Sequence, residues 1–317
     1  MKCLVTGAKG FIGAHLVRHL LDAGHEVRAV DSLESAGSIA QARLENVRIE
    51  RSVVDPSIWQ PVCRDVEVVF HLAGRVHRGD NSSPSARSAY FRDNLEMTRA
   101  LAEAALKEGV RRLVFASTAT VYGTASVAGE AFREDTPVAP YPGDVYAQSK
   151  RAAEEFLLSG STALETVVVR LPLVYGVGVK ANMAMLVRLV QSGLPLPLAG
   201  IDNRRSFINI PNCVDFFLTT ACHSGASGRI LLASDREDVA TPDLIRAIAR
   251  GSGKSARLFS VPVGLLKMGC SLFGSRLERL TCNFQIDPAA SCTLLDWSPK
   301  VSFTEGIAQM CAGQGEA

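Results

Sequence analysis

The chain has 317 residues, of which 47% are hydrophobic and 21% are charged, with a formal net charge of +2 at pH 7. Balanced charge, with Lys and Arg scattered along the chain, argues against nucleic acid as a partner. No apolar run approaches the roughly 18 residues that span a bilayer, and no signal peptide is apparent. We therefore expect a cytoplasmic globular protein of one large and one smaller lobe.

The first thirty residues predict a β-α-β unit. A short apolar strand leads into the turn Thr6-Gly7-Ala8-Lys9-Gly10-Phe11-Ile12-Gly13, which opens an amphipathic helix, and a strand over 26–30 ends at Asp31. Such glycines let the backbone approach a pyrophosphate at a helix N-terminus, and the acid accepts hydrogen bonds from an adenosine ribose. A glycine turn without a ligand is the alternative. The predicted dinucleotide contacts here are Gly7, Gly10, Phe11, Ile12, Gly13, Asp31 and Ser32.

The next two predicted strands lead to further candidate contacts with the dinucleotide. A third strand over 46–51 leads to Val54 and Asp55, beside the expected adenine, where Asp55 binds the exocyclic amine or caps the helix starting near Pro56. A fourth strand ends in His71-Leu72-Ala73-Gly74. Small residues at the carboxyl end of a strand let the backbone pass close to a cofactor. We expect His71 to be a structural donor rather than a catalytic base.

The remaining elements predict a doubly wound α/β fold. A long helix over 89–107 carries Asn94, a fifth strand over 112–116 leads into Ser117 to Gly123, and a sixth strand over 166–171 is closed by Pro172. Later elements are helices over 182–192, 214–222, 241–251, 261–273 and 303–312, with strands over 204–210 and 229–233. A membrane-surface helix is a minor alternative for 261–273.

We predict a Rossmann-type parallel sheet domain over 1–171, to which 205–235 returns, and a substrate lobe made of 172–204 and 236–317. The eight cysteines form no Cys-x-x-Cys pair and do not combine with His at metal-ligand spacing. They are predicted to be mostly buried, reduced thiols, and no metal site is expected.

Three polar side chains are expected to converge beside the dinucleotide. Tyr146 and Lys150 lie four residues apart at the start of a helix, so both project from one face, and Thr118 ends the fifth strand. The lysine ammonium and a positively charged nicotinamide favour the phenolate form of the tyrosine. Such a tyrosine can remove the proton of a sugar or alcohol hydroxyl while hydride leaves its carbon.

These motifs together resemble an extended short-chain dehydrogenase/reductase of the nucleotide-sugar epimerase/dehydratase/reductase branch. The matching pieces are the glycine turn, Asp31, His71 to Gly74, Asn94, Ser117 to Gly123, Tyr146-x-x-x-Lys150, Arg170 and Arg205 to Ile208. The resemblance covers most of residues 1–215. It implies NAD, a UDP-sugar acted on at C4, and a homodimer through the helices near 89–107 and 145–158.

The resemblance also implies roles for single residues. Thr118 and Tyr146 touch the sugar, Asn182 lies near the diphosphate and Arg205 pairs with it. A surface ion pair is the alternative for Arg205. The expected cofactor contacts beyond the first β-α-β unit are Val54, Asp55, Leu72, Ala73, Gly74, Asn94, Ala116, Tyr146, Lys150 and Pro172.

Departures from the family patterns separate the candidate reactions. Dehydratases of this branch carry Asp-Glu where this chain has Ala119 and Thr120, so dehydration is not expected. Ala119 to Gly123 resembles 4-epimerases. Residues 171–173 and 203–206 look more like bacterial reductases of UDP-4-keto-6-deoxy-N-acetylhexosamines in O-antigen synthesis.

Asp31 favours the epimerase over the reductase, because a carboxylate at this position favours NAD over NADP and an epimerase retains its NAD. The leading prediction is therefore a UDP-glucose or UDP-N-acetylglucosamine 4-epimerase in bacterial surface polysaccharide (lipopolysaccharide) synthesis. The NAD(P)H-dependent 4-keto-reductase comes second. A non-catalytic nucleotide-binding regulator is the alternative of another class.

Overall fold

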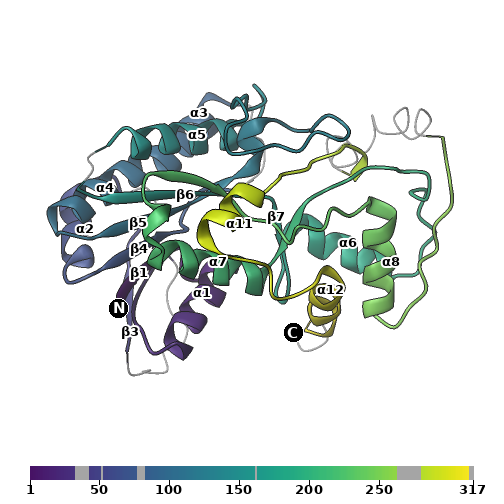
Figure 1. Ribbon diagram of the computed structural model, residues 1–317, viewed down its shortest axis with the longest axis horizontal. Coiled ribbons are helices and arrows are strands. Elements are labelled where there is room, and N and C mark those ends of the chain that lie inside the picture. Colours follow the sequence, from purple (N-terminus) through teal and green to yellow (C-terminus); the bar gives the residue numbers. More distant parts are fainter. Residues whose placement is uncertain (33–42, 51–52, 77–82, 161–162, 263–279, 314–317) are drawn as a thin grey trace.

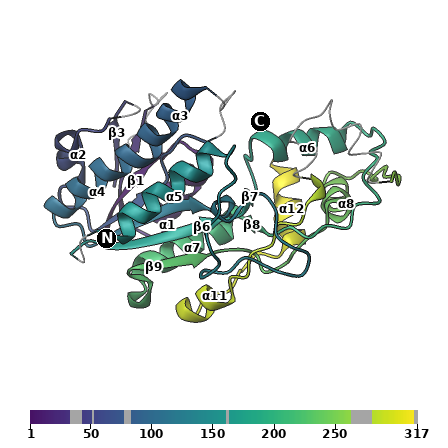
Figure 2. The same ribbon diagram turned by 90° about the horizontal axis from the view of Figure 1, so that it is seen from above.

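A parallel seven-stranded sheet forms the centre of the larger domain (Figures 1 and 2). The computed structural model describes residues 1–32, 43–50, 53–76, 83–160, 163–262 and 280–313. The sheet has the strand order β3-β2-β1-β4-β5-β6-β9, so the order reverses between β1 and β4. The crevice at such a reversal is where ligands of doubly wound sheets bind. The strands are β1 (Lys2–Thr6), β2 (Glu26–Asp31), β3 (Leu44–Arg48), β4 (Val68–His71), β5 (Arg112–Thr118), β6 (Glu165–Leu171) and β9 (Arg229–Leu232).

Helices cover both faces of the sheet, because alternate side chains of each strand point to opposite faces. Cys3 and Val5 of β1 pack into the core under α1 (Phe11–Asp22) and α7 (Ile210–Cys222). Leu4 between them packs into the other core. The helices on that second face are α2 (Pro56–Cys63), α4 (Met97–Lys107) and α5 (Val145–Leu158). The predicted α/β sheet fold is therefore confirmed.

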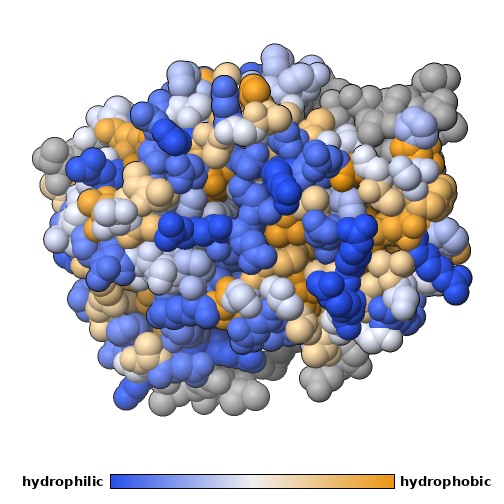
Figure 3. Space-filling view, turned by 45° about the vertical axis from the view of Figure 1, so that its right-hand side comes forward, coloured by the Kyte–Doolittle hydropathy of each residue, from blue (hydrophilic) through white to orange (hydrophobic). Residues whose placement is uncertain are grey.

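A smaller lobe lies beside the carboxyl side of the sheet (Figure 2). Its core is formed by α6 (Ala181–Gln191), α8 (Thr241–Gly251) and α12 (Phe303–Ala312). A two-stranded parallel sheet of β7 (Leu173–Tyr175) and β8 (Phe207–Asn209) leads into it, and α11 (Ala289–Leu295) packs against the larger domain. Hydrophilic side chains dominate the face shown in Figure 3, with separate apolar patches between them.

Several predicted elements differ from the structure, among them the helix predicted over 214–222, which begins at Ile210. The third strand covers Leu44–Arg48 rather than 46–51, and the predicted strand over 204–210 is shortened to Phe207–Asn209 because Pro211 starts a helix. The predicted helix over 89–107 begins earlier and is interrupted. It consists of α3 (Pro84–Phe91), a π-helical segment η1 (Arg92–Glu96) and α4.

The earlier start of α3 has a local cause, since the Ser83 hydroxyl accepts a hydrogen bond from the Ala86 amide and Pro84 occupies the first turn. Most of the predicted helix over 261–273 falls outside the described residues. The domain boundaries stay a prediction.

A buried ion pair joins α5 to β6. The Arg170 guanidinium donates to both carboxylate oxygens of Glu154, at 2.6–3.2 Å, and both side chains are at most 3% exposed. The Ser117 hydroxyl donates to the same carboxylate, and Arg170 also donates to the Tyr122 hydroxyl at 2.7 Å. The pair therefore fixes α5 against the ends of two neighbouring strands.

Replacing Glu154 by Gln is expected to lower the free energy of unfolding by about 3–5 kcal/mol, because it leaves the Arg170 charge buried without a counter-charge. Urea denaturation measures the loss. Glu155→Gln is the matched control, since Glu155 pairs with Arg151 at 2.7 Å and is 62% exposed. The control should cost less than about 1 kcal/mol. Equal losses in the two variants would contradict the role given to the buried pair.

Candidate active site

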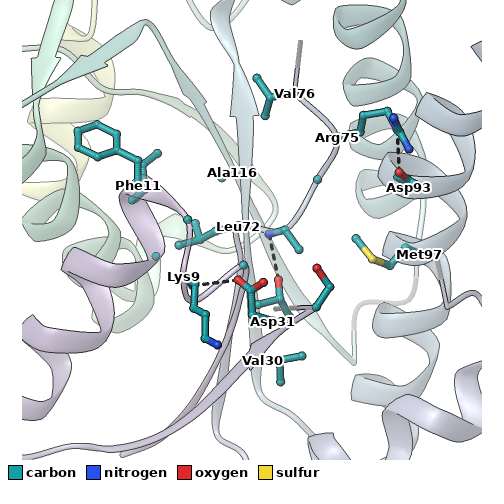
Figure 4. Close-up of a pocket in the computed structure, with 18 of the residues that line it drawn as sticks. Lys9, Phe11, Val30, Asp31, Leu72, Arg75, Val76, Asp93, Met97 and Ala116 are labelled. Carbon is teal, nitrogen blue, oxygen red and sulfur yellow. Dashed lines mark hydrogen bonds and ion pairs between the residues drawn. The ribbon is translucent and has the colours of Figure 1, made fainter. Parts of the chain in front are cut away.

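A pocket of about 530 Å³ opens at the carboxyl edge of the sheet, at the strand-order reversal (Figure 4). That volume lies within the usual range for small-molecule sites. The pocket gathers most of the residues predicted from sequence, drawn from the ends of β1, β2, β4, β5 and β6 and from the start of α5. They are Gly7, Gly10, Phe11, Ile12, Gly13, Asp31, Ser32, Leu72, Ala73, Gly74, Ala116, Thr118, Tyr146, Lys150 and Pro172.

Gly7 and Gly13 of the glycine turn lie so close to neighbouring backbone atoms that neither position has room for a side chain. Gly7 has φ +67°, and a Cβ there would lie 2.9 Å from the Ala73 backbone nitrogen. A Cβ at Gly13 would overlap the carbonyl oxygen of Gly7. The backbone N–H of Lys9 donates to the Asp31 carboxylate at 2.9 Å (Figure 4). The turn is thus held at the end of β2, and its bare backbone fits a dinucleotide pyrophosphate.

A buried hydrogen-bond chain runs beneath the turn. The Ala73 amide donates to the Thr6 hydroxyl, which lies 2.7 Å from Nδ1 of His71, while Nε2 lies 2.9 Å from the Thr98 hydroxyl. Thr98 donates in turn to the Asn94 carbonyl, so it accepts from His71, and the Thr6 hydroxyl donates to Nδ1. Burial, and then the charge of Lys150, lower the pKa of His71 to about 3. The ring is neutral, and its predicted role as a structural donor fits this geometry.

Asn94 lies behind the pocket wall rather than in it. Its amide oxygen accepts from the Arg75 backbone N–H at 2.6 Å, and its nitrogen donates to the Ser149 hydroxyl at 2.8 Å. A Cβ at Gly74 would lie 2.9 Å from the amide oxygen. Asn94 therefore fixes the loop after β4 against α5. Its contact with the cofactor stays a prediction.

Thr118, Tyr146 and Lys150 meet at one end of the pocket. Thr118 and Tyr146 are hydrogen-bonded through their side chains. Lys150 is 3% exposed, its ammonium donates to the Ala116 carbonyl at 2.9 Å, and it lies 4.3 Å from the centre of the Phe115 ring. A hydroxyl pair and a cation thus face the same space, which suits proton transfer to a bound alcohol or ketone.

Burial dominates the electrostatics of Tyr146 and Lys150. Desolvation of the phenolate, together with the Asp144 charge, raises the pKa of Tyr146 despite the hydrogen bond to Thr118. Burial lowers the pKa of Lys150 to about 8, against the opposing effect of Glu154. Burial of the phenol thus opposes the stabilisation of the phenolate that the sequence predicts from Lys150 and an oxidised nicotinamide together, and the Lys150 ammonium donates to a carbonyl.

The predicted adenine contacts at Val54 and Asp55 lie outside the pocket wall. Val54 is 44% exposed, and Asp55 caps α2 by accepting from the Ser57 amide at 2.8 Å. Val30, Ile49 and Trp59 line that end of the pocket instead. Sequence reasoning missed them, although an apolar residue after the third strand and an aromatic on the next helix were available as signals.

Asn182 and Arg205 are not brought to this pocket either. Asn182 is exposed on the first turn of α6. Arg205 donates to the Cys282 carbonyl at 3.2 Å and lies over the Phe284 ring. Lys180 and Arg75, which sequence reasoning did not single out, do line the pocket, and Arg75 pairs with Asp93 at 2.8 Å (Figure 4). The roles of Asn182 and Arg205 toward a diphosphate stay predictions.

Comparison with known proteins identifies the family. A family model described as the NAD-dependent epimerase/dehydratase family matches residues 3–233. The chain belongs to this family. The expected resemblance, the NAD cofactor and the assignment as an enzyme are thereby confirmed.

Similar proteins include a UDP-glucose 4-epimerase from Vibrio cholerae, 33% identical over 96% of this chain and 93% of that protein. A 3β-hydroxysteroid dehydrogenase/Δ5→4-isomerase from Mycobacterium tuberculosis is 27% identical over 80% of this chain and 70% of its own length. Among solved structures, MoeE5 in complex with UDP-glucuronic acid and NAD is 25% identical, with a TM-score of 0.77 over 100% of this chain and 99% of that one.

The parts of the chain with described coordinates contain no cluster of His, Cys, Asp or Glu that could hold a metal ion. No helix within those parts combines the length and apolarity needed to cross a bilayer. The described cysteines are free thiols, and Cys222 is the exposed one among them.

Gly13→Ala is expected to weaken NAD binding at least about tenfold, because the new methyl displaces the Gly7 carbonyl from the turn. Alanine otherwise favours a helix by about 1 kcal/mol, so a loss would show that the steric term wins. Isothermal titration calorimetry with NAD measures the effect. Gly160→Ala is the control, since its Cβ would meet its nearest neighbour at 3.5 Å. Unchanged NAD affinity in Gly13→Ala would contradict the close approach.

The pKa of Lys150 makes stability depend on pH. The pKa of Lys150 is about 8 in the native protein and 10.5 when unperturbed. Between these two pH values the unfolded chain holds a proton that the native protein has released, so the free energy of unfolding rises with pH. Lys150→Met removes this dependence. The stability of the variant relative to wild type should therefore fall by roughly 1–3 kcal/mol between pH 7 and pH 10 in urea denaturation.

Lys107→Met, on the exposed side of α4, provides the baseline for that pH series. A stability difference between Lys150→Met and wild type that stays constant after this correction would show that Lys150 titrates in the native protein as it does in the unfolded chain.

Proposed function

We propose that the protein is a UDP-sugar 4-epimerase that uses bound NAD, with UDP-glucose or UDP-N-acetylglucosamine as substrate. The observation that carries the proposal is the hydrogen-bonded pair Thr118 and Tyr146 with Lys150 beside it, at the end of a pocket that begins with the glycine turn and Asp31. The UDP-glucose 4-epimerase with which this chain shares 33% identity over nearly full length supports the substrate class.

Different residues of the pocket would bind the cofactor and transfer the proton. The glycine turn and Asp31 would hold the pyrophosphate and adenosine ribose, and Lys150 the nicotinamide ribose. Bound NAD supplies the chemistry of taking up hydride from C4 of the sugar and returning it. Tyr146 exchanges a proton with the C4 oxygen, taking it up when the hydroxyl is oxidised and returning it when the ketone is reduced. Thr118 orients the same oxygen.

The residues after Thr118 argue against elimination of water. Ala119 is fully buried and apolar, and the Thr120 hydroxyl lies 3.0 Å from that of Thr118. Neither supplies the acid or the second base that a dehydration requires. The contact between the Thr120 and Thr118 hydroxyls instead keeps the Thr118 hydroxyl in place for transfer of a single proton.

The second candidate is an NAD(P)H-dependent reductase of a UDP-4-keto-6-deoxy-N-acetylhexosamine. The observation in its favour is that Leu171 and Pro172 line the pocket, at positions where epimerases of the glucose/galactose type carry an aromatic residue and an asparagine. We also propose that the protein works in the cytoplasm, in O-antigen or other surface polysaccharide synthesis, as a homodimer through the helices near 89–107 and 145–158.

The two candidates are separated by a cofactor balance. The purified protein is incubated with UDP-glucose, UDP-N-acetylglucosamine and a UDP-4-keto-6-deoxy sugar, with and without added NADH or NADPH, and products are followed by NMR. Interconversion of C4 epimers without added cofactor supports the epimerase. Consumption of reduced cofactor in proportion to product, with the keto sugar alone, would replace it by the reductase.

Tyr146→Phe is expected to lower kcat roughly 10²–10⁴-fold with little change in substrate affinity, because it removes the transferred proton and leaves the ring in place. Tyr141→Phe is the matched control, since Tyr141 is 56% exposed on a loop, and it should retain wild-type turnover. Turnover by Tyr146→Phe at the wild-type rate would favour the non-catalytic nucleotide-binding alternative over both enzyme candidates.

A further inference from the structure

Two threonine hydroxyls lie in contact at the end of β5. Thr118 ends the strand and caps the short helix η2 (Ala119–Tyr122), and its hydroxyl accepts a hydrogen bond from the Thr120 backbone N–H at 3.2 Å. Threonine suits this position because its hydroxyl can satisfy an amide two residues further on. In the capped turn the Thr120 hydroxyl lies 3.0 Å from the Thr118 hydroxyl. The two side chains therefore form one hydrogen-bonded pair.

This threonine pair leads from Tyr146 to the outside of the pocket. The side chains of Tyr146 and Thr118 are hydrogen-bonded, and both residues line the pocket. Among the described residues Thr120 does not line the pocket, and it is half-buried whereas Thr118 is buried. Thr120 thus presents part of its surface to solvent elsewhere. One end of the chain of three hydroxyls lies in the pocket, and the other lies at the protein surface.

The hydrogen-bonding capacity of Thr118 matches its two hydroxyl neighbours. A hydroxyl has one proton to donate and two lone pairs that accept. Thr118 accepts from the Thr120 backbone N–H, which leaves one lone pair and its own proton for the hydroxyls of Tyr146 and Thr120. When Thr118 donates to Tyr146 it accepts from Thr120, and in the reverse arrangement it accepts from Tyr146 and donates to Thr120. Both arrangements are complete, so the three groups can pass a proton in either direction without moving apart.

Filling the pocket would separate the phenol from water. A dinucleotide and a sugar bound as proposed would cover the side of Tyr146 that faces the pocket. The neighbouring Lys150 is 3% exposed, and its ammonium donates to the Ala116 carbonyl. Exchange of a proton between Tyr146 and water then needs a path through side chains, and the threonine pair supplies one.

We propose that Thr118 and Thr120 form a proton relay that joins Tyr146 to solvent while ligands fill the pocket. Before a C4 hydroxyl is oxidised, Tyr146 gives its proton to Thr118, Thr118 gives its own to Thr120, and Thr120 gives its own to water. The phenolate can then accept the C4 proton. The reverse passage takes a proton from water and restores the phenol, and only O–H bonds are made and broken. The inference rests on the proposed function, in that Tyr146 exchanges a proton with the sugar.

A proton inventory of the epimerase reaction tests the relay. Turnover of UDP-glucose and of UDP-N-acetylglucosamine is measured in mixtures of H₂O and D₂O, and kcat of the wild type should depend on the deuterium fraction along a curve, because several hydroxyl protons move together. Thr120→Val keeps the side-chain shape and removes the hydroxyl. It should lower kcat roughly tenfold, less than the loss of the acid–base group itself, and make the dependence linear. KM should stay within about twofold, because Thr120 acts through Thr118 rather than on the sugar.

Thr120→Ser restores the hydroxyl and should restore both the curve and a kcat within about threefold of wild type. Thr219→Val is the matched control, because Thr219 is half-buried on α7 and its hydroxyl donates to the Asp215 carbonyl at 2.9 Å. It should retain the wild-type kcat and curve.

A wild-type kcat in Thr120→Val, or a raised KM with kcat and the curve unchanged, would overturn the relay and leave the proposed epimerase standing. A Thr120→Ser variant as impaired as Thr120→Val would also overturn it. If the wild-type protein turns over neither sugar, the relay and the proposed function fall together.

Discussion

The buried hydrogen-bond chain through His71 is the constraint on which the pocket depends. It joins the end of β1, the end of β4 and the start of α4 by bonds whose directions are all determined. Because each donor in the chain has one acceptor, the Thr6 turn and the Ala73 loop cannot move apart without leaving a buried polar group unpaired. The close approach of Gly7 to Ala73 follows from this, and so does the shape of the cofactor site.

Successive turns of α5 line the pocket and hold the helix in place. Tyr146 and Lys150 face the pocket, and Glu154 one turn later is held in the ion pair with Arg170. The buried pair fixes the helix along its axis and in rotation, so it determines where the Tyr146 hydroxyl meets Thr118. Burial of Lys150 between them lowers its pKa, and burial of Tyr146 raises the pKa of the phenol.

Local sequence signals predicted the fold well where they were strong. The helices over 241–251 and 303–312 and the β-α-β unit were found because apolar spacing and glycines act within a few residues. The π-helical segment η1, in which Asp93 and Asn94 are buried, was not predicted from the sequence. Likewise, no local motif shows that Arg48 stands beside Asp31, because strand pairing joins them. The rise in the pKa of Tyr146 on burial could not be predicted from sequence, because desolvation depends on the assembled pocket.

The place of β3 at the edge of the sheet has an evolutionary consequence. An edge strand has a neighbour on one side alone, and the Arg48 side chain is exposed, so a substitution there disturbs little of the core. The reacting groups lie on β5 and α5, on the other side of β1. Substitutions on this edge strand can therefore change the residue paired with Asp31, while three strands of the sheet separate that residue from Thr118 on β5.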